Sequence, residues 1–140
     1  MKPIPNTQNA LVVRTDFSDQ AVWEALRGMI SSPVGLYRFR ANVEFLDDPQ
    51  YDGLTRDQLI AQTPVNYNHT FIIIVDRLTI TGPDHPVLVI DLYERSGNAF
   101  RALPKEVQSI ENNLSIANMD FEEFSQAVDS DGVFRSFPRR

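Results

Sequence analysis

The sequence predicts a single α/β domain of three layers, in which helices flank a mixed, mostly parallel sheet of about five strands. Short apolar runs alternate along the chain with segments whose apolar residues recur at helical spacing. Two of these runs, Phe71 to Val75 and Val87 to Ile90, are apolar throughout, as central strands covered on both faces are. The length of 140 residues suits one hydrophobic core.

We expect a flexible leader at residues 1–9, the domain at residues 10–137 and a short tail at residues 138–140. The leader has no apolar stretch typical of a signal peptide, and no run approaches the roughly 18 residues of a membrane span. The chain also lacks cysteine, which agrees with a reducing compartment and leaves no thiolate metal site. These features favour a cytoplasmic protein with no membrane partner and no cofactor.

The first half of the chain predicts two strands and two helices. Residues 11–15 are rich in β-branched side chains, and residues 42–46 alternate in polarity as a strand near a sheet edge does. Thr55 and Gln58 form a capping box that opens a short helix. A longer helix is expected from Asp19 to Ser31, capped by Asp16 or Ser18, with Trp23 packed against the sheet. Its apolar stripe consists of Val22, Ala25, Leu26, Met29 and Ile30.

The second half predicts a hairpin and two further helices. A parallel crossover usually needs a dozen or more residues, so the link at residues 76–86 is borderline in length. We prefer a parallel pair of central strands and leave an antiparallel pair open. Ser96-Gly97-Asn98 is typical of a hairpin turn and predicts an antiparallel fifth strand through Leu103. Pro104 opens one helix, which carries Val107, Ile110 and Leu114, and Asp120 with Glu123 forms a capping box for the last, through Val128.

Aspartates follow the strands and are the first candidates for a functional site. If the strands are neighbours, these carboxylates gather where open α/β sheets usually bind ligands. They could then hold a divalent cation for hydrolysis or phosphotransfer, with Asp16, Asp47 and Asp76 as metal ligands and Asp91 as a further catalytic candidate. Hydrogen bonds to local amides, as in helix caps and Asp-Pro turns, are the favoured explanation for the first three and for Asp48.

Asp91 lacks such a local explanation. It shares a strand face with Val87 and Val89, where an unpaired carboxylate would cost several kcal/mol. We therefore expect a cationic partner, supplied by Arg14, Arg77 or Arg101.

A second candidate site is the asparagine-rich segment between the last two helices. Asn112, Asn113, Asn118 and Asp120 could bind a partner through their donors and acceptors. The favoured alternative is that these amides fix the loop by bonding to the backbone.

The net charge of −6 argues against nucleic acid and favours a basic protein partner. With no catalytic motif, the sequence favours a protein-binding or regulatory module, of the immunity or inhibitor kind, over an enzyme. The alternative is the metal-assisted hydrolase or phosphotransfer protein. A third hypothesis is a homodimer built on the strand near Asn42 or on the aromatic side chains of Phe134 and Phe137.

Several of these segments are also similar to a known family. They are Val13 to Asp19, Val43 to Asp48, and Glu111 to Phe124 followed by Asp131 to Arg135. Together they resemble a family of small bacterial proteins, frequent in actinomycetes, that is catalogued as a domain of unknown function. The resemblance extends from about Leu11 to Phe137 and implies a bacterial, single-domain, cytoplasmic protein. It brings no assigned catalytic or binding residues.

Overall fold

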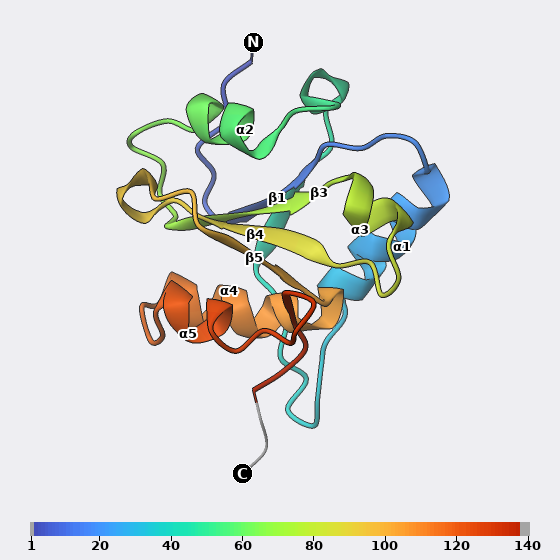
Figure 1. Ribbon diagram of the computed structural model, residues 1–140, viewed down its shortest axis with the longest axis vertical. Helices are drawn as coiled ribbons and strands as arrows, with labels where there is room; N and C mark the ends of the chain where they lie inside the picture. The colour runs from blue at the N-terminus through green and yellow to red at the C-terminus, as the bar shows by residue number, and fades with distance from the viewer. Residues whose placement is uncertain (1, 138–140) are drawn as a thin grey trace.

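A six-stranded mixed sheet with the order β2-β1-β3-β4-β5-β6 is the centre of the computed structural model, which describes residues 2–137 (Figure 1). The α/β prediction is confirmed, with one strand more than expected. Val43–Leu46 is an edge strand, as its alternation predicts. The strands are β1 (Ala10–Arg14), β2 (Val43–Leu46), β3 (Phe71–Val75), β4 (Val87–Asp91), β5 (Ala99–Ala102) and β6 (Val133–Phe134).

The two central strands are antiparallel, so the preference for a parallel pair was wrong. Ile73 of β3 lies opposite Val12 in the parallel pair with β1 and opposite Val89 in the antiparallel pair with β4. The link between β3 and β4 holds only a five-residue helix, α3 (Arg77–Thr81), after which Gly82 and Pro86 turn the chain back at the same edge. The predicted β4–β5 hairpin is antiparallel, and β6 pairs with β5 in parallel.

Helices cover both faces of the sheet. The helix α2 (Arg56–Gln62) lies above it in Figure 1, whereas α4 (Val107–Ser115) and α5 (Phe121–Ser125) lie below. The helix α1 (Gln20–Ser31) packs on the same face as α4. Three short 3-10 turns complete the fold, at Pro49–Tyr51, Tyr93–Arg95 and Pro104–Glu106. No helix within the described residues is long and apolar enough to cross a membrane.

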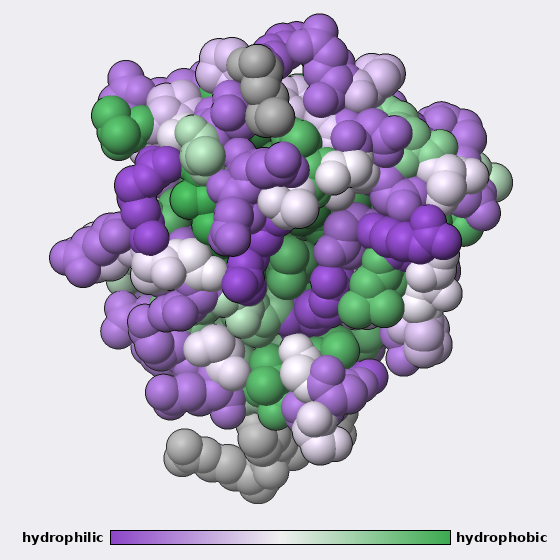
Figure 2. All heavy atoms as spheres, turned by 45° about the horizontal axis from the view of Figure 1, so that its top comes forward, coloured by the Kyte–Doolittle hydropathy of each residue, from purple (hydrophilic) through white to green (hydrophobic). Residues whose placement is uncertain are grey.

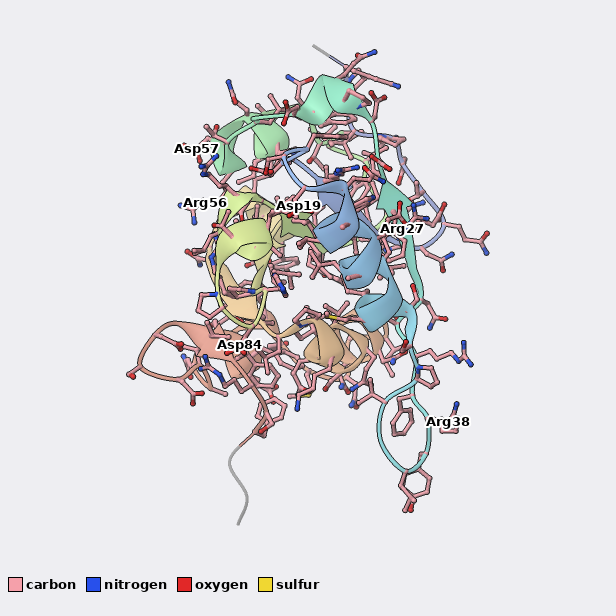
Figure 3. All side chains as sticks on the ribbon, turned by 90° about the vertical axis from the view of Figure 1, so that its right-hand side faces the viewer. Asp19, Arg27, Arg38, Arg56, Asp57 and Asp84 are labelled. Atoms are coloured by element: carbon pink, nitrogen blue, oxygen red, sulfur yellow. The ribbon has the colours of Figure 1, made fainter. Side chains whose placement is uncertain are left out.

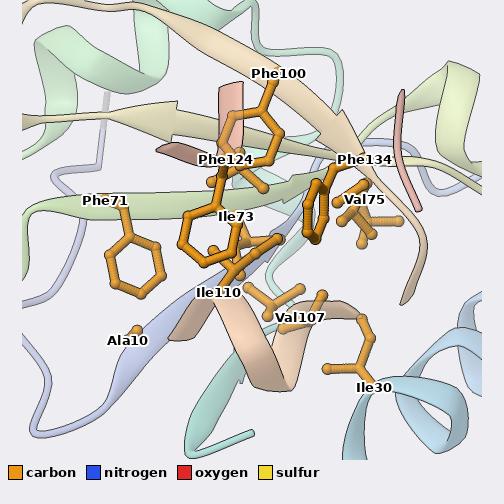
Figure 4. Packing of buried hydrophobic residues seen from close by; sticks show 14 of the residues in the cluster. Ala10, Ile30, Phe71, Ile73, Val75, Phe100, Val107, Ile110, Phe124 and Phe134 are labelled. Carbon is orange, nitrogen blue, oxygen red and sulfur yellow. The ribbon is translucent and has the colours of Figure 1, made fainter. Parts of the chain in front are cut away.

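The larger of two cores lies between the sheet and α1, α4 and α5 (Figure 4). Aromatic rings fill one end of it: Phe124 stacks on Phe100 with centroids 6.4 Å apart and meets Phe134 edge-on at 5.3 Å. Phe134 is fully buried and packs on Phe137, so it belongs to the chain's own core. Of the two rings suggested for a homodimer surface, Phe137 is the exposed one, at 39%.

Helix α1 departs from its prediction in two details. Its N-cap is Asp19, whose carboxylate accepts a hydrogen bond from the Val22 amide at 3.1 Å, and neither Asp16 nor Ser18 caps it. The buried side chains are Trp23, Leu26 and Ile30, while the predicted stripe residues Ala25 and Met29 are exposed. Trp23 packs against the sheet as predicted, and the helix is rotated so that this large ring occupies the centre of the contact.

The smaller core lies under α2 and includes part of the predicted leader. Ile4 is buried there with Leu59 and Ile72, and its amide donates to the Gln62 carbonyl at 2.8 Å. Ile4 therefore anchors the leader to the domain, whereas most other residues of the leader are exposed. The predicted tail lies outside the described residues. On the face shown in Figure 2, hydrophobic side chains reach the surface in small groups between hydrophilic ones.

The capping box of α2 is formed as predicted. The Gln58 amide donates to Thr55 Oγ1 at 3.2 Å, and the Thr55 amide donates to Gln58 Oε1 at 2.9 Å. We expect Thr55→Ala to lower the free energy of unfolding by about 1 kcal/mol, because one first-turn amide loses its acceptor. Urea denaturation measures this change, and Thr55→Ser, which keeps the hydroxyl, is the control. Equal losses in the two variants would contradict the capping role.

Candidate functional site

The strand-end aspartates divide between the two edges of the sheet. Strands β1, β2 and β3 are parallel, so Asp16, Asp47 and Asp76 follow them at one edge, which faces the viewer in Figure 3. Strand β4 runs the other way and carries Asp91 to the opposite edge. We call these the carboxyl edge and the amino edge, after the ends of the parallel strands.

At the carboxyl edge, the Asp47 carboxylate accepts hydrogen bonds from two buried residues, Arg14 and Trp23. Its Oδ1 accepts a bond from Arg14 at 3.2 Å and its Oδ2 accepts one from the Trp23 indole at 3.2 Å. The buried Arg14 guanidinium also lies 4.2 Å from the centre of the Phe17 ring. These contacts position α1 on the sheet and give Asp47 a structural role. Asp48 caps the Pro49–Tyr51 turn, as its local explanation predicts.

Asp76 is the centre of a second local network. Both of its oxygens accept bonds from Arg101, at 3.0 and 2.8 Å, and Oδ1 also accepts one from the Thr79 amide as the N-cap of α3. Burial acts to raise the pKa of Asp76, but the bonds and charge of Arg101 and the Thr79 donors outweigh it, and the pKa is lowered. Asp76 is therefore a structural carboxylate.

A cleft of about 620 Å³ opens between the ends of β1 and β3. The strand order reverses here, because β2 follows β1 on one side of it and β3 lies on the other, and in open α/β sheets such a point is a ligand site. Its lining includes Asp16, Asp52, Asp76 and Arg77. However, Asp16 accepts bonds from the Ser18 amide and hydroxyl, and residues 2–137 contain no group of three potential ligands placed to hold a metal ion. The geometry lends no support to a metal-assisted reaction at this edge.

Asp91 occupies a different environment at the amino edge. It is 5% exposed, and its two oxygens accept bonds from the Tyr93 amide at 3.0 Å and the Ser96 hydroxyl at 2.8 Å. The predicted arginine partner was wrong: at the other edge, Arg14 binds Asp47, Arg101 binds Asp76, and Arg77 lines the cleft there. Within the described residues, Asp91 is a buried carboxylate with two hydrogen bonds and no ion pair.

The turn after Asp91 is held in an uncommon backbone conformation. Glu94 and Arg95 have positive φ angles of 53° and 52°, which cost about 1–3 kcal/mol each in non-glycine residues. The Arg95 guanidinium anchors the turn to the end of α2 by donating to the Ile60 carbonyl at 2.5 Å and the Thr63 carbonyl at 3.3 Å. The turn thus presents Tyr93 and Ser96 to Asp91 in a fixed arrangement.

Asp91 forms part of a cleft of about 470 Å³ between this turn and the segment that joins α4 to α5. We call it the amino-edge cleft; its volume lies within the roughly 300–1,000 Å³ of ligand pockets. Its described lining contains no lysine, arginine or histidine. The lining combines the carboxylates of Asp91, Asp120 and Glu122 with the apolar side chains of Leu114, Met119 and Phe121. Two predicted site residues, Asp91 and Asp120, therefore meet in one cleft.

The side chains of Asn112, Asn113 and Asn118 mainly fix the local backbone through hydrogen bonds. Asn112 donates to the Arg40 carbonyl at 2.9 Å and to the Gln108 carbonyl at 2.7 Å. The side chains of Asn113 and Asn118 bond to each other at 2.9 Å, which closes the turn before α5. These bonds agree with the loop-fixing interpretation, and Asn112 also lines a hollow.

That hollow is a second, amide-rich one at the amino edge, of about 630 Å³. Its wall includes Asn9, Asn42, Asn112 and His69, together with Glu111. Glu111 is buried and already accepts bonds from the Asn42 amide and the Ser115 hydroxyl, both at 2.6 Å. Nearby, burial raises the pKa of Tyr67 to about 12. Like Asp91, Glu111 is a buried carboxylate with two hydrogen bonds and no ion pair within the described residues, but the lining of this hollow is amide-rich and lacks the apolar wall of the amino-edge cleft.

The model of one protein family, described as a domain of unknown function (DUF6924), matches residues 9–137. The chain belongs to the DUF6924 family. This match covers the whole sheet and both edges, so the amino-edge cleft is built entirely from DUF6924 residues. A search of curated proteins finds no similar sequence.

Proposed function

We propose that this DUF6924 protein is a protein-binding module whose amino-edge cleft receives a cationic side chain, with an apolar neighbour, from a basic segment of a partner. The observation that carries this proposal is Asp91, a buried carboxylate that forms part of a cleft and has no ion pair among residues 2–137. The cation that the sequence requires for Asp91 would then come from outside the chain.

Burial and lining both support this assignment. An ion pair made at a buried carboxylate is screened less by solvent than a surface pair is, so a guanidinium there would gain more. Asp120 and Glu122 add negative charge at the cleft, while Met119 and Phe121 offer apolar contact. The net charge of −6 would also speed the approach of a basic partner. Binding of this kind, without a catalytic step, fits a regulatory or inhibitor-like role.

The proposal can be tested with two blocked dipeptides, acetyl-Tyr-Arg-amide and acetyl-Tyr-Glu-amide. We expect the arginine peptide to shift the backbone amide resonances of Tyr93, Met119 and Phe121 in an NMR titration, and to bind at least about tenfold more tightly than the glutamate peptide. The difference should shrink in high salt, because part of it comes from exposed charge.

Two variants and a control test whether this binding takes place at the amino-edge cleft. Asp91→Asn and Glu122→Gln should each weaken the arginine peptide severalfold, whereas Asp52→Asn removes the same charge at the carboxyl edge and should leave binding unchanged. Shifts clustered at the carboxyl edge, or equal binding of both peptides, would refute the proposal. Stoichiometric Mg²⁺ binding by calorimetry would instead revive the metal-assisted alternative.

A further inference from the structure

A short hairpin between α1 and β2 stands out from the rest of the surface. We call residues 34–39 the tongue; it lies at the foot of Figure 1 and at the lower right of Figure 3, where Arg38 is labelled. Val34 and Phe39 pair in antiparallel fashion through two backbone bonds of 2.8 and 3.0 Å, and the Arg38 amide donates to the Gly35 carbonyl at 3.1 Å. Gly35 has a φ angle of 77°, which favours glycine at this turn.

The tip of the tongue is apolar and projects into solvent. Leu36 is 91% exposed, Tyr37 80% and Phe39 56%, and the rings of Tyr37 and Phe39 lie 6.1 Å apart. Single exposed apolar residues are common, but a cluster on a projecting hairpin is typical of an interaction site. Tyrosine and arginine are also among the residues that dominate binding energy at protein interfaces.

The tongue is also basic and firmly anchored. Residues 32–42 contain Arg38 and Arg40 and no carboxylate, in a chain whose net charge is −6. At its base, Asn112 donates to the Arg40 carbonyl and Glu111 accepts a bond from the Asn42 amide. The tip therefore needs little further ordering to bind, which favours affinity.

We propose that the tongue of one copy of this chain occupies the amino-edge cleft of a second copy. This inference rests on the proposed function and names the partner of the same cleft. The complementarity has two parts: the cleft has three carboxylates and no cationic residue in its described lining, whereas the tongue has arginine and no carboxylate. The apolar wall of Leu114, Met119 and Phe121 matches Leu36 and Tyr37.

The two surfaces lie on different sides of one molecule. In Figure 1 the tongue is at the bottom, whereas the β4–β5 turn and the α4–α5 connection, which bound the cleft, are on the left. An anchored tongue thus docks on another copy. Two copies that exchange tongues form a two-fold dimer, whereas a contact that leaves the second tongue and cleft free repeats head to tail into a ring or an open chain.

A mixing experiment tests this arrangement. Arg38→Glu removes the tongue's charge but leaves the cleft intact, and Glu122→Arg spoils the cleft but leaves the tongue intact. We expect the mass of the wild-type protein in sedimentation velocity to rise with concentration, and each variant alone to stay monomeric at concentrations at least about tenfold higher. An equimolar mixture of the two variants should form a complex of two chains and nothing larger, because only one tongue–cleft pair remains.

The control is Arg56→Glu, which makes the same charge change on an exposed residue of α2 and should associate like the wild-type protein. A wild-type monomer at every concentration, unchanged association of Arg38→Glu, or a mixture that stays monomeric would each overturn the inference. The dipeptide titration, repeated on Arg38→Glu with its intact cleft, separates the two proposals. If the arginine peptide binds there and no association occurs, the cleft function stands and the second copy is the wrong partner.

Discussion

Replacement of Phe124 by alanine is expected to lower the free energy of unfolding by about 3–5 kcal/mol, the range for large aromatic truncations in a core. Phe124 is fully buried, and its ring contacts Phe100, Phe134 and Phe137 with centroids 5.3–6.4 Å apart. Three aromatic neighbours cannot all move into the space that one ring leaves, so a cavity would remain. Because α5 is only five residues long, this packing is the main source of its stability.

Urea denaturation followed by circular dichroism measures the loss. The control is Phe39→Ala, the same substitution on the exposed tongue, which we expect to change stability by no more than about 0.5 kcal/mol. Similar losses in the two variants would show that the aromatic cluster is not the anchor of α5. The Phe124 variant should also weaken binding at the amino-edge cleft, because α5 supplies Phe121 and Glu122 to it.

Sequence patterns that span only a few residues predicted the elements that begin or join through interactions between those same residues. The capping boxes at Thr55 and Asp120 and the turn at Ser96-Gly97-Asn98 act within a few residues, and each begins or joins the expected element. The strand β6 has only two residues and exists because Val133 and Phe134 pair with β5. The helix α3 begins at a capping box whose third residue is Thr79 in place of the usual glutamate or glutamine. Neither β6 nor α3 has a sequence pattern long enough for it to be predicted.

The candidate site depends on contacts between residues far apart in the sequence, and no local sequence pattern predicts these. The apolar strand around Asp91 correctly indicated a buried acid, but the choice of partner depended on the direction of β4. With β3 and β4 parallel, Asp91 would have followed β4 to the carboxyl edge, where Arg14 lies. The antiparallel pairing places it instead beside the start of α5, so that the acid and Asp120 line one cleft. Strand direction therefore decided which side chains could meet.

Replacement of Arg101 by methionine is expected to lower the free energy of unfolding by about 1.5–3 kcal/mol at pH 7, the range for hydrogen bonds to a charged group. Arg101 on β5 binds both oxygens of Asp76 and the Pro86 carbonyl at 3.1 Å, so it ties the end of β3 to the residue before β4. Methionine keeps most of the apolar stem but leaves the half-buried Asp76 carboxylate without a cation. The control is Arg77→Met on the exposed start of α3, which should change stability by no more than about 0.5 kcal/mol.

The pH dependence distinguishes a lost ion pair from lost packing. The pKa of Asp76 is lowered in the folded protein. As the pH falls through the unfolded pKa of about 3.9, this carboxylate therefore takes up a proton in the unfolded chain before it does so in the folded protein. The stability that the pair supplies is therefore full above about pH 5 and is lost as the pH falls through the folded pKa. In Arg101→Met, burial is left to raise the pKa of Asp76, and the variant should gain stability relative to the wild-type protein as the pH falls. Urea denaturation at pH 7 and near pH 3 should thus show a gap between the two proteins that narrows in acid, whereas a gap of constant size would mean that Arg101 acts through packing alone.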